Sequence, residues 1–430
     1  MTRISFPAAA WFAIATTSLA TVAAFPAARA DADWPSFRGS ADTGRVVAGE
    51  LPARLDASTT LWQHELKSRD VGSPIVWKDR LFLLRSRPAR SSISLDCLSL
   101  TDGTEIWSAE FPQSDYHLHQ RNTLASGTPA ADAEQVYVTW SDGAHTFLVA
   151  MDHEGQEIWR RDFGRFQSQH GYGASPLVVG EQVILFFSQQ AESLDPGDEP
   201  GESRMIAVDR KTGNTHWTCP LTTTRVCYGT PAVVDDASGR PKWLIGANTG
   251  DGLFGIDLTN GRLQFRSDAF SKRCCSSPLV VGDLLIGSCG SGGGGNEMVA
   301  VRMPDQGSIA REVYRIKSGA PYVPTAVVRD GKLFAVDDRG IASCFDAMTG
   351  ETITRKRLGG NFGASPILVG DKILAIDLQG KATVMSADDK MESLLDVDLG
   401  GPVGATPVFV QGKLIIRVDD RLVCYAGESS

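Results

Sequence analysis

The chain contains 430 residues, with 42 Lys or Arg against 51 Asp or Glu and a formal net charge of −9 at pH 7. This acidic balance argues against general nucleic-acid binding, which needs a basic surface. The length exceeds what one ordinary hydrophobic core holds, so the chain must contain either several domains or structural repeats.

Residues 1–30 have the pattern of a secretory signal peptide. Arg3 gives a positively charged start, residues 8–24 are small and apolar, and Ala28-Arg29-Ala30 forms an A-x-A cleavage site. A membrane anchor is the alternative, but the apolar run is short and no second hydrophobic segment follows it. We therefore expect a periplasmic or otherwise exported chain without an integral membrane segment, with 40 basic and 51 acidic residues after cleavage.

Residues 31–59 are predicted to form an irregular N-terminal arm. The arm contains the segment WPSFRG (34–39), and residues 42–58 show no periodicity. Residues 60–66 (TLWQHEL) then read as a strand that carries the large aromatic residue Trp62. No repeat precedes this strand, so it is expected to be an outer strand that completes a sheet formed elsewhere in the chain.

A short frame recurs along the rest of the chain, most clearly in residues 205–217 (MIAVDRKTGNTHW). Ile206 and Val208 alternate as in a half-buried strand, residues 209–213 have the chemistry of a tight turn, and Trp217 opens the next strand. The frame returns at residues 97–107, 150–159, 255–265 and 344–353. Recurrence of this kind is typical of a repeat architecture.

A second marker, a small hydroxyl residue beside a proline, occurs once in each repeat and so gives the number of repeats. It occurs at Ser73-Pro74, Thr128-Pro129, Ser175-Pro176, Thr230-Pro231, Ser277-Pro278, Pro324-Thr325, Ser365-Pro366 and Thr406-Pro407. Each marker precedes two β-rich runs joined at a tight turn, which indicates a hairpin. The spacing suits four-stranded propeller blades. The last unit ends after its third strand, and the strand at Trp62 can supply the fourth and close the ring.

Residues 60–430 are therefore predicted to form an all-β fold. The prediction is an eight-bladed β-propeller of four-stranded antiparallel blades, closed by an N-terminal strand. The repeat frame, with Ala207, Asp209, Thr212, Gly213 and Trp217, resembles the docking motif of eight-bladed quinoprotein propellers, the pyrroloquinoline-quinone (PQQ)-type repeats.

The segments WPSFRG (34–39), LASGTPAAD (124–132), EIWRRDFG (157–164) and HGYGASP (170–176) narrow this resemblance. They are similar to secreted bacterial PQQ-like propellers, labelled BamB-like by analogy with the propeller subunit of the outer-membrane β-barrel assembly machinery. The resemblance spans roughly Trp34 to Tyr425. It implies the fold, and the function has to be argued from a site.

Strand order predicts where that site lies. If the marker strand is innermost, the tight turns gather on one face of the ring and the connections between blades gather on the other. Binding residues concentrate on irregular loops held by a rigid scaffold. The inter-blade loops carry cations that can converge on the channel mouth, together with tyrosines that offer stacking surface. These candidates are Arg69, His117, His119, Arg121, His170, Arg225, Lys272 and Arg273, with Tyr172, Tyr228 and Tyr322.

Converging cations in an acidic protein indicate an anionic small molecule or an acidic, extended protein segment as the ligand. The alternative is that each cation pairs with an acid on a neighbouring loop. His117, His119 and His170 also permit a zinc or copper site. We expect hydrogen-bonding histidines instead, and no metal site is predicted.

Three of the eight cysteines, Cys97, Cys344 and Cys424, occupy a repeat column that elsewhere holds Ala or Gly, and they are expected to be buried, inert thiols. The other five gather in the fourth and fifth units, and their pairing cannot be read from sequence. These five are Cys219, Cys227, Cys274, Cys275 and Cys289. The Cys274-Cys275 pair bears on function, because the quinoprotein alcohol dehydrogenases that the chain resembles have a vicinal cysteine pair beside their cofactor.

Two functions compete at this point. The first is a monomeric binding scaffold without catalytic residues or a cofactor. The second is a small PQQ-dependent oxidoreductase, which would need PQQ and calcium. Short loops, and the lack of an alignable Glu/Asn calcium pair or catalytic Asp, favour the binding scaffold.

Overall fold

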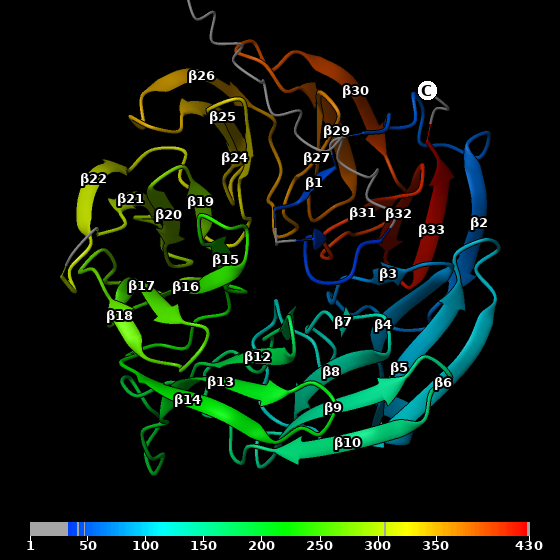
Figure 1. Cartoon of the computed structure of the whole chain (residues 1–430). Helices are drawn as coiled ribbons and strands as arrows, with labels where there is room; N and C mark the ends of the chain where they lie inside the picture. Colours follow the sequence, from blue (N-terminus) through cyan, green and yellow to red (C-terminus); the bar gives the residue numbers. More distant parts are fainter. Residues whose placement is uncertain (1–32, 41–42, 47, 305–306, 428–430) are drawn as a thin grey trace, which may run out of the picture.

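The computed structural model describes residues 33–40, 43–46, 48–304 and 307–427 (Figure 1). The predicted signal peptide lies outside these residues. Eight sheets follow one another around a closed ring, and the last strand, in red, lies beside the blue N-terminal strand. The predicted eight-bladed all-β propeller is confirmed. Among the described residues, no helix is long and apolar enough to cross a membrane.

Each blade is built on four antiparallel strands that follow one another from the channel to the rim. Blade 1 contains β3 (Ile75–Trp77), β4 (Arg80–Arg87), β5 (Ser92–Ser99) and β6 (Glu105–Pro112), and blade 2 contains β7 (Ala130–Ala131), β8 (Gln135–Ser141), β9 (Thr146–Asp152) and β10 (Glu157–Asp162). Blade 3 contains β11 (Leu177–Val179), β12 (Gln182–Phe187), β13 (Ser203–Asp209) and β14 (Thr215–Leu221). Blade 4 contains β15 (Ala232–Asp235), β16 (Pro241–Asn248), β17 (Gly252–Asp257) and β18 (Leu263–Phe265). A 3₁₀ turn, η2 (Pro88–Arg90), joins β4 to β5.

Blades 5 to 8 repeat the same order. Blade 5 contains β19 (Leu279–Val281), β20 (Leu284–Cys289), β21 (Glu297–Arg302) and β22 (Arg311–Ile316), and blade 6 contains β23 (Val327–Arg329), β24 (Lys332–Val336), β25 (Ile341–Asp346) and β26 (Thr352–Arg357). Blade 7 contains β27 (Ile367–Val369), β28 (Lys372–Ile376), β29 (Lys381–Ser386) and β30 (Ser393–Asp398). Blade 8 contains β31 (Val408–Val410), β32 (Lys413–Val418), β33 (Arg421–Ala426) and β2 (Thr60–Glu65).

The N-terminal strand β2 completes blade 8, as predicted. It pairs antiparallel with β33, and Trp62 lies opposite Cys424. Because the first and last parts of the chain share one sheet, the ring has no open junction at which another strand could add. Within the arm expected to be irregular, β1 (Arg45–Val46) adds to blade 7 by pairing parallel with β27.

Aromatic residues of the outer strands dock several of the blades onto the next one. The indole N–H of Trp159 donates to the Arg210 carbonyl at 2.8 Å, and that of Trp217 donates to the Leu258 carbonyl at 3.0 Å. The ring of Trp159 also covers the turn at Gly213, where a Cβ atom would lie 2.7 Å from it. The turn therefore needs glycine both for this contact and for its φ of +71°. The tryptophans pack between blades, as predicted.

The marker hydroxyls form a belt around the channel. Backbone amides donate to a hydroxyl of the following blade, for example Ser365 N to Thr406 Oγ1 and Thr406 N to Ser73 Oγ, both at 3.0 Å. The same bond joins Ser73 to Thr128, Thr128 to Ser175, Ser277 to Thr325 and Thr325 to Ser365. We call the eight residues Ser73, Thr128, Ser175, Thr230, Ser277, Thr325, Ser365 and Thr406 the hydroxyl belt.

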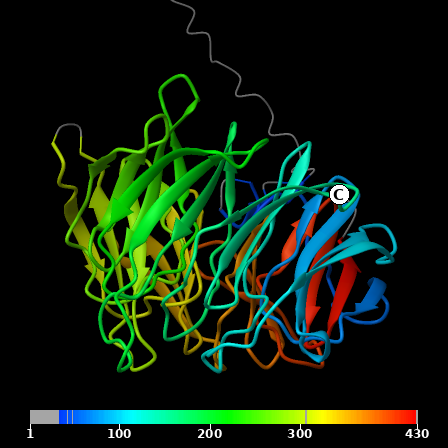
Figure 2. The same cartoon turned by 90° about the horizontal axis from the view of Figure 1, so that it is seen from below.

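Figure 2 views the ring from the side, with the strands running between two faces. The amide of Arg210, in a turn between third and fourth strands, donates to the Glu181 carbonyl, in a turn between first and second strands. The amide of Gln190, in a loop between second and third strands, donates to the Gln167 carbonyl in a connection between blades. These contacts place the turns on one face, the turn face, and the irregular connections on the other, the loop face, as the strand order predicts.

Candidate functional site

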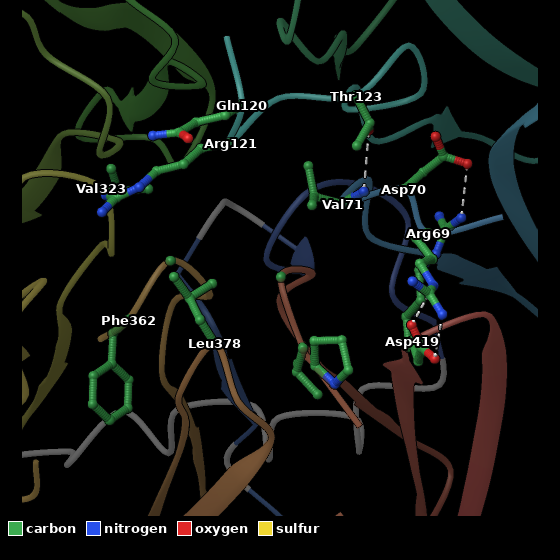
Figure 3. Close-up of a pocket in the computed structure, with 15 residues that line it drawn as sticks. Arg69, Asp70, Val71, Gln120, Arg121, Thr123, Val323, Phe362, Leu378 and Asp419 are labelled. Carbon is green, nitrogen blue, oxygen red and sulfur yellow. Dashed lines mark hydrogen bonds and ion pairs between the residues drawn. The ribbon is translucent and has the colours of Figure 1, made fainter. Parts of the chain in front are cut away.

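A cavity of about 400 Å³ opens on the loop face, and we call it the funnel (Figure 3). It is lined by connections from blades 1, 2, 6, 7 and 8. A narrower channel of about 160 Å³ adjoins it, and Val71, Val323, Gly363 and Gly404 line both spaces. The channel is bounded by the hydroxyl belt and by Phe37 of the N-terminal arm. The funnel and channel together form one axial cavity.

The residues that line the channel follow a repeat column. Each lies two positions before a member of the hydroxyl belt, so eight blades contribute eight equivalent positions. These are Val71, Ser126, Gly173, Tyr228, Cys275, Val323, Gly363 and Gly404. The channel wall could have been predicted from this column, because its position relative to each marker is fixed in the sequence. Phe37 could not, because it belongs to the arm and to no repeat.

Matched charges lie on one side of the funnel, where blade 8 meets blade 1. Arg417 is 2% exposed, and its guanidinium contacts the Asp70 carboxylate at 3.0 Å. Asp70 also accepts hydrogen bonds from the amide and hydroxyl of Ser86. Nearer the solvent, Arg69 Nε contacts Asp419 Oδ1 at 2.7 Å, and Figure 3 shows the two side chains turned toward each other.

Arg121 lies on the opposite side of the funnel in Figure 3, beside Gln120 and Val323. Its side chain is exposed, and the part of the chain that the structure describes provides no ion-pair partner for it. Its backbone amide donates to His119 Nδ1 at 3.3 Å. Arg121 therefore links the funnel to a second group of predicted site residues.

That second group contains His119, His170 and Arg273. The two imidazole rings stack with their centroids 4.5 Å apart, and Arg273 NH1 lies 3.1 Å from His170 Nε2. Burial, together with the positive charge of Arg273 and the neighbouring groups His119, Arg225 and His117, lowers the pKa of His170 to about 4. His170 is therefore neutral at pH 7, and its Nε2 accepts the hydrogen bond from Arg273.

Cations in this group have no carboxylate partner among the described residues. Arg273 is 6% exposed, and its Nε donates to the Val226 carbonyl at 2.9 Å. The exposed Arg225 donates to the Ser193 hydroxyl at 3.1 Å. Burial leaves Arg273 NH2 and His170 Nδ1 without a hydrogen-bond partner among the described atoms. We call His117, His119, His170, Arg225 and Arg273 the unmatched cluster.

The remaining candidates have local partners. Lys272 turns toward the glycine-rich loop and donates to the Gly295 carbonyl at 2.7 Å. Tyr172 is buried, with its hydroxyl 2.6 Å from that of Thr139. Tyr228 donates to the Gly171 carbonyl at 3.0 Å, and Tyr322 is buried beside Arg273 and Cys275. These tyrosines support the loops, and of the three only Tyr228 lines the channel.

All eight cysteines are free thiols in the structure. Cys97, Cys344 and Cys424 are fully buried, as predicted, and burial raises the pKa of the Cys97 thiol to about 12. Cys275 lines the channel, where burial raises its pKa to about 12 as well. Cys274 donates its backbone amide to Cys227 Sγ at 3.3 Å. Neutral thiols such as Cys97 and Cys275 are poor nucleophiles, whereas, against the opposing effect of burial, hydrogen bonds from Cys274 lower the pKa of Cys227.

The fold and its docking aromatics define a PQQ-like β-propeller. The family described as "Outer membrane protein assembly factor BamB" matches residues 48–285 and 201–393, which together cover more than half of the chain. The chain therefore belongs to this family, as the sequence motifs predicted. No curated protein matches it.

Solved structures show the same architecture. BamB from Moraxella catarrhalis aligns with a TM-score of 0.60 and 15% identity, covering 86% of this chain and 98% of BamB. A europium-containing methanol dehydrogenase aligns with a TM-score of 0.63 and 12% identity, covering 90% of this chain and 89% of the enzyme. The computationally designed protein Ika8 aligns with a TM-score of 0.60 and 10% identity, covering 86% of this chain and 99% of Ika8. At these identities the likeness establishes the fold alone.

Proposed function

We propose that the chain is an exported, monomeric binding scaffold that holds an anionic ligand or an acidic partner segment on its loop face. The observation that carries the proposal is the unmatched cluster, where buried and exposed cations gather without a carboxylate among the described residues. The family is described as an outer membrane assembly factor. By extension from that description, we propose that this chain holds a segment of another protein.

Grouped cations repel one another, so this arrangement costs stability unless something offsets the charge. Arg273 is held by a carbonyl and an imidazole, which orient its guanidinium but supply no negative charge. The charge of Arg273 therefore contributes to the positive electrostatic potential at the loop face. Arg225 is exposed and supplies a direct contact, because a guanidinium can bind a carboxylate through two parallel hydrogen bonds.

The alternative is a PQQ-dependent oxidoreductase, which we consider because a methanol dehydrogenase shares this fold. The side chains of the axial cavity favour binding instead. Its two carboxylates, Asp70 and Asp419, are already held by Arg417 and Arg69. Among the described residues, no group of three or more His, Cys, Asp or Glu could hold a metal ion. With both carboxylates paired, the axial cavity offers no free acid to a calcium ion, which supports the binding scaffold over the oxidoreductase.

Fluorescence anisotropy with a labelled oligo-glutamate peptide tests the proposal. We expect saturable binding that weakens as salt rises, because exposed charges are screened. Arg225→Ala should weaken binding by about tenfold, the equivalent of ~1.4 kcal/mol. Arg240→Ala is the matched control, since Arg240 is an exposed arginine in a turn-face connection paired with Asp236.

Two results would overturn the proposal. One is binding that the Arg225 and Arg240 variants reduce equally, because the loop face would then have no special role. The other is a quinone absorbance and dye reduction after reconstitution with PQQ and calcium, which would support the oxidoreductase.

A further inference from the structure

The axial funnel combines an apolar wall with a cation at its rim. Six residues form the wall, which we call the collar: Val71, Val323, Phe362, Leu378, Pro402 and Val403. Resting on the proposed binding function, we infer that the funnel captures the C-terminus of a polypeptide whose last residue is large and apolar. The apolar side chain enters the collar and the terminal carboxylate meets Arg121.

The collar has the character of a preformed apolar pocket. Phe362 and Val403 are 3% and 0% exposed, so they form fixed parts of this wall, while Val71, Val323 and Leu378 are half-buried and present surface to the cavity. The residues come from four blades whose sheets hold them in place. A volume of about 400 Å³ lies within the range of small-ligand pockets and accommodates one large side chain.

Arg121 is the guanidinium that remains available at the rim. Arg69 contacts both oxygens of Asp419, at 2.7 and 3.4 Å, so its charge is already matched. Arg417 is buried against Asp70. Arg121 is exposed on the opposite side of the funnel, and no described carboxylate pairs with it (Figure 3). A ligand carboxylate beside the collar therefore meets one free cation.

The floor of the cavity argues for a peptide and against a long acyl chain. Below the collar lies the hydroxyl belt, whose members are all at least nine-tenths buried. Six of its oxygens accept an amide hydrogen, and no described acceptor takes the hydroxyl hydrogens. An acyl tail longer than the collar would leave these donors unsatisfied, whereas one side chain ends above them.

The described ends of the chain do not reach the funnel. Asp33 accepts a hydrogen bond from the amide of Lys78, and the amide of Gly427 donates to the Gly412 carbonyl, both in turns between first and second strands. These contacts lie on the turn face. Phe37 of the same arm lines the channel, and none of the described terminal residues lines the funnel.

The test uses the purified full chain and a fluorescein-labelled peptide, Gly-Ser-Gly-Ser-Phe, with a free C-terminal carboxylate. We expect the amidated peptide, and a peptide ending in Ser, to bind at least about tenfold more weakly, as loss of a charged hydrogen bond or a buried apolar group predicts. Arg121→Met should abolish the preference for the free acid, and Leu378→Ser should reduce the preference for Phe. Arg240→Met is the turn-face control, and thermal unfolding checks that each variant folds.

Several outcomes would overturn the inference. Equal binding of acid and amide, or an unchanged acid preference in Arg121→Met, removes the role of Arg121. Decanoate that binds where the peptide does not would indicate a lipid anion. If oligo-glutamate binds through Arg225 while Gly-Ser-Gly-Ser-Phe fails, the inference falls and the proposed function stands. If neither probe binds, both fall.

Discussion

Where blade 8 meets blade 1, Arg417 and Arg69 contact carboxylates, whereas Arg225 and Arg273, on the loops that precede blades 4 and 5, contact a hydroxyl, a carbonyl and an imidazole. Arg417 and Arg273 show the difference most clearly, since they are only 2% and 6% exposed. Arg417 is paired with Asp70, and Arg273 is held by Val226 and His170. Both guanidiniums are fixed in place, but only the first is neutralised.

The difference separates charges that hold the fold together from charges that can act on a ligand. A buried ion pair is a closed unit, and removing one partner leaves an uncompensated charge in a low-dielectric site. A cation held by neutral groups keeps its field, which extends to the exposed residues around it. The matched pairs are therefore structural, whereas the unmatched cluster keeps a positive charge on which the proposed binding function depends.

The largest effect is expected at Asp70. Asp70→Asn removes the negative charge beside Arg417 and should lower the free energy of unfolding by about 3–5 kcal/mol. Asp419→Asn is the matched control, because its partner Arg69 has a 75% exposed side chain and such pairs contribute only about 0–1 kcal/mol. Asn also tolerates the left-handed backbone at position 419, where φ is +53°. Urea unfolding curves with equal slopes measure both changes.

Similar losses in the two variants would contradict this part of the comparison. The burial of Arg417 would then have no energetic consequence, and the matched side could not be called structural on that ground.

A pH dependence is expected from the unmatched cluster. The pKa of His170 falls from 6.5 to about 4 on folding, because of burial and the cations around it. Between these values the unfolded chain binds a proton that the folded chain does not, so stability falls as pH drops from 6.5 toward 4. His170→Gln should remove this part of the loss. Melting temperatures of both proteins across this pH range measure it, and parallel curves would contradict the assignment.

The ring itself could be predicted because its signals are local and repeated. Ser/Thr-Pro markers precede the inner strands of seven blades, and in blade 6 the proline moves to Pro324 while Thr325 keeps its place. The hydroxyl persists because it accepts the amide hydrogen of Ser277 in the neighbouring blade. The docking tryptophans follow the same logic, since each needs a turn glycine in the next blade.

Local and repeated signals could not predict whether each candidate cation is paired with an acid. Arg69 and Asp419, like Arg417 and Asp70, lie about 350 residues apart and meet only because the ring closes. No local pattern distinguishes Arg69 from Arg225, although one is paired with an acid and the other with a hydroxyl. The binding role of the predicted residues stays a prediction, and the geometry shows which of them keep an uncompensated charge.

The smallest effect on stability is expected at Arg273. Comparing its substitution with that of Arg417 tests the difference between the two buried arginines directly. Arg273→Met removes a buried cation without stranding a carboxylate, and methionine fills much of the same volume. Replacing a buried ionic group by an apolar side chain of similar size is often neutral, so we expect a change below about 1 kcal/mol. Arg417→Met is the matched substitution, and it should cost about 3–5 kcal/mol because Asp70 is left buried and unpaired. The pKa of His170, followed by NMR, should rise in Arg273→Met because the nearest positive charge is gone. If Arg273→Met instead destabilises the protein as much as Arg417→Met, with the pKa of His170 unchanged, Arg273 is a structural residue and the two buried arginines have the same role.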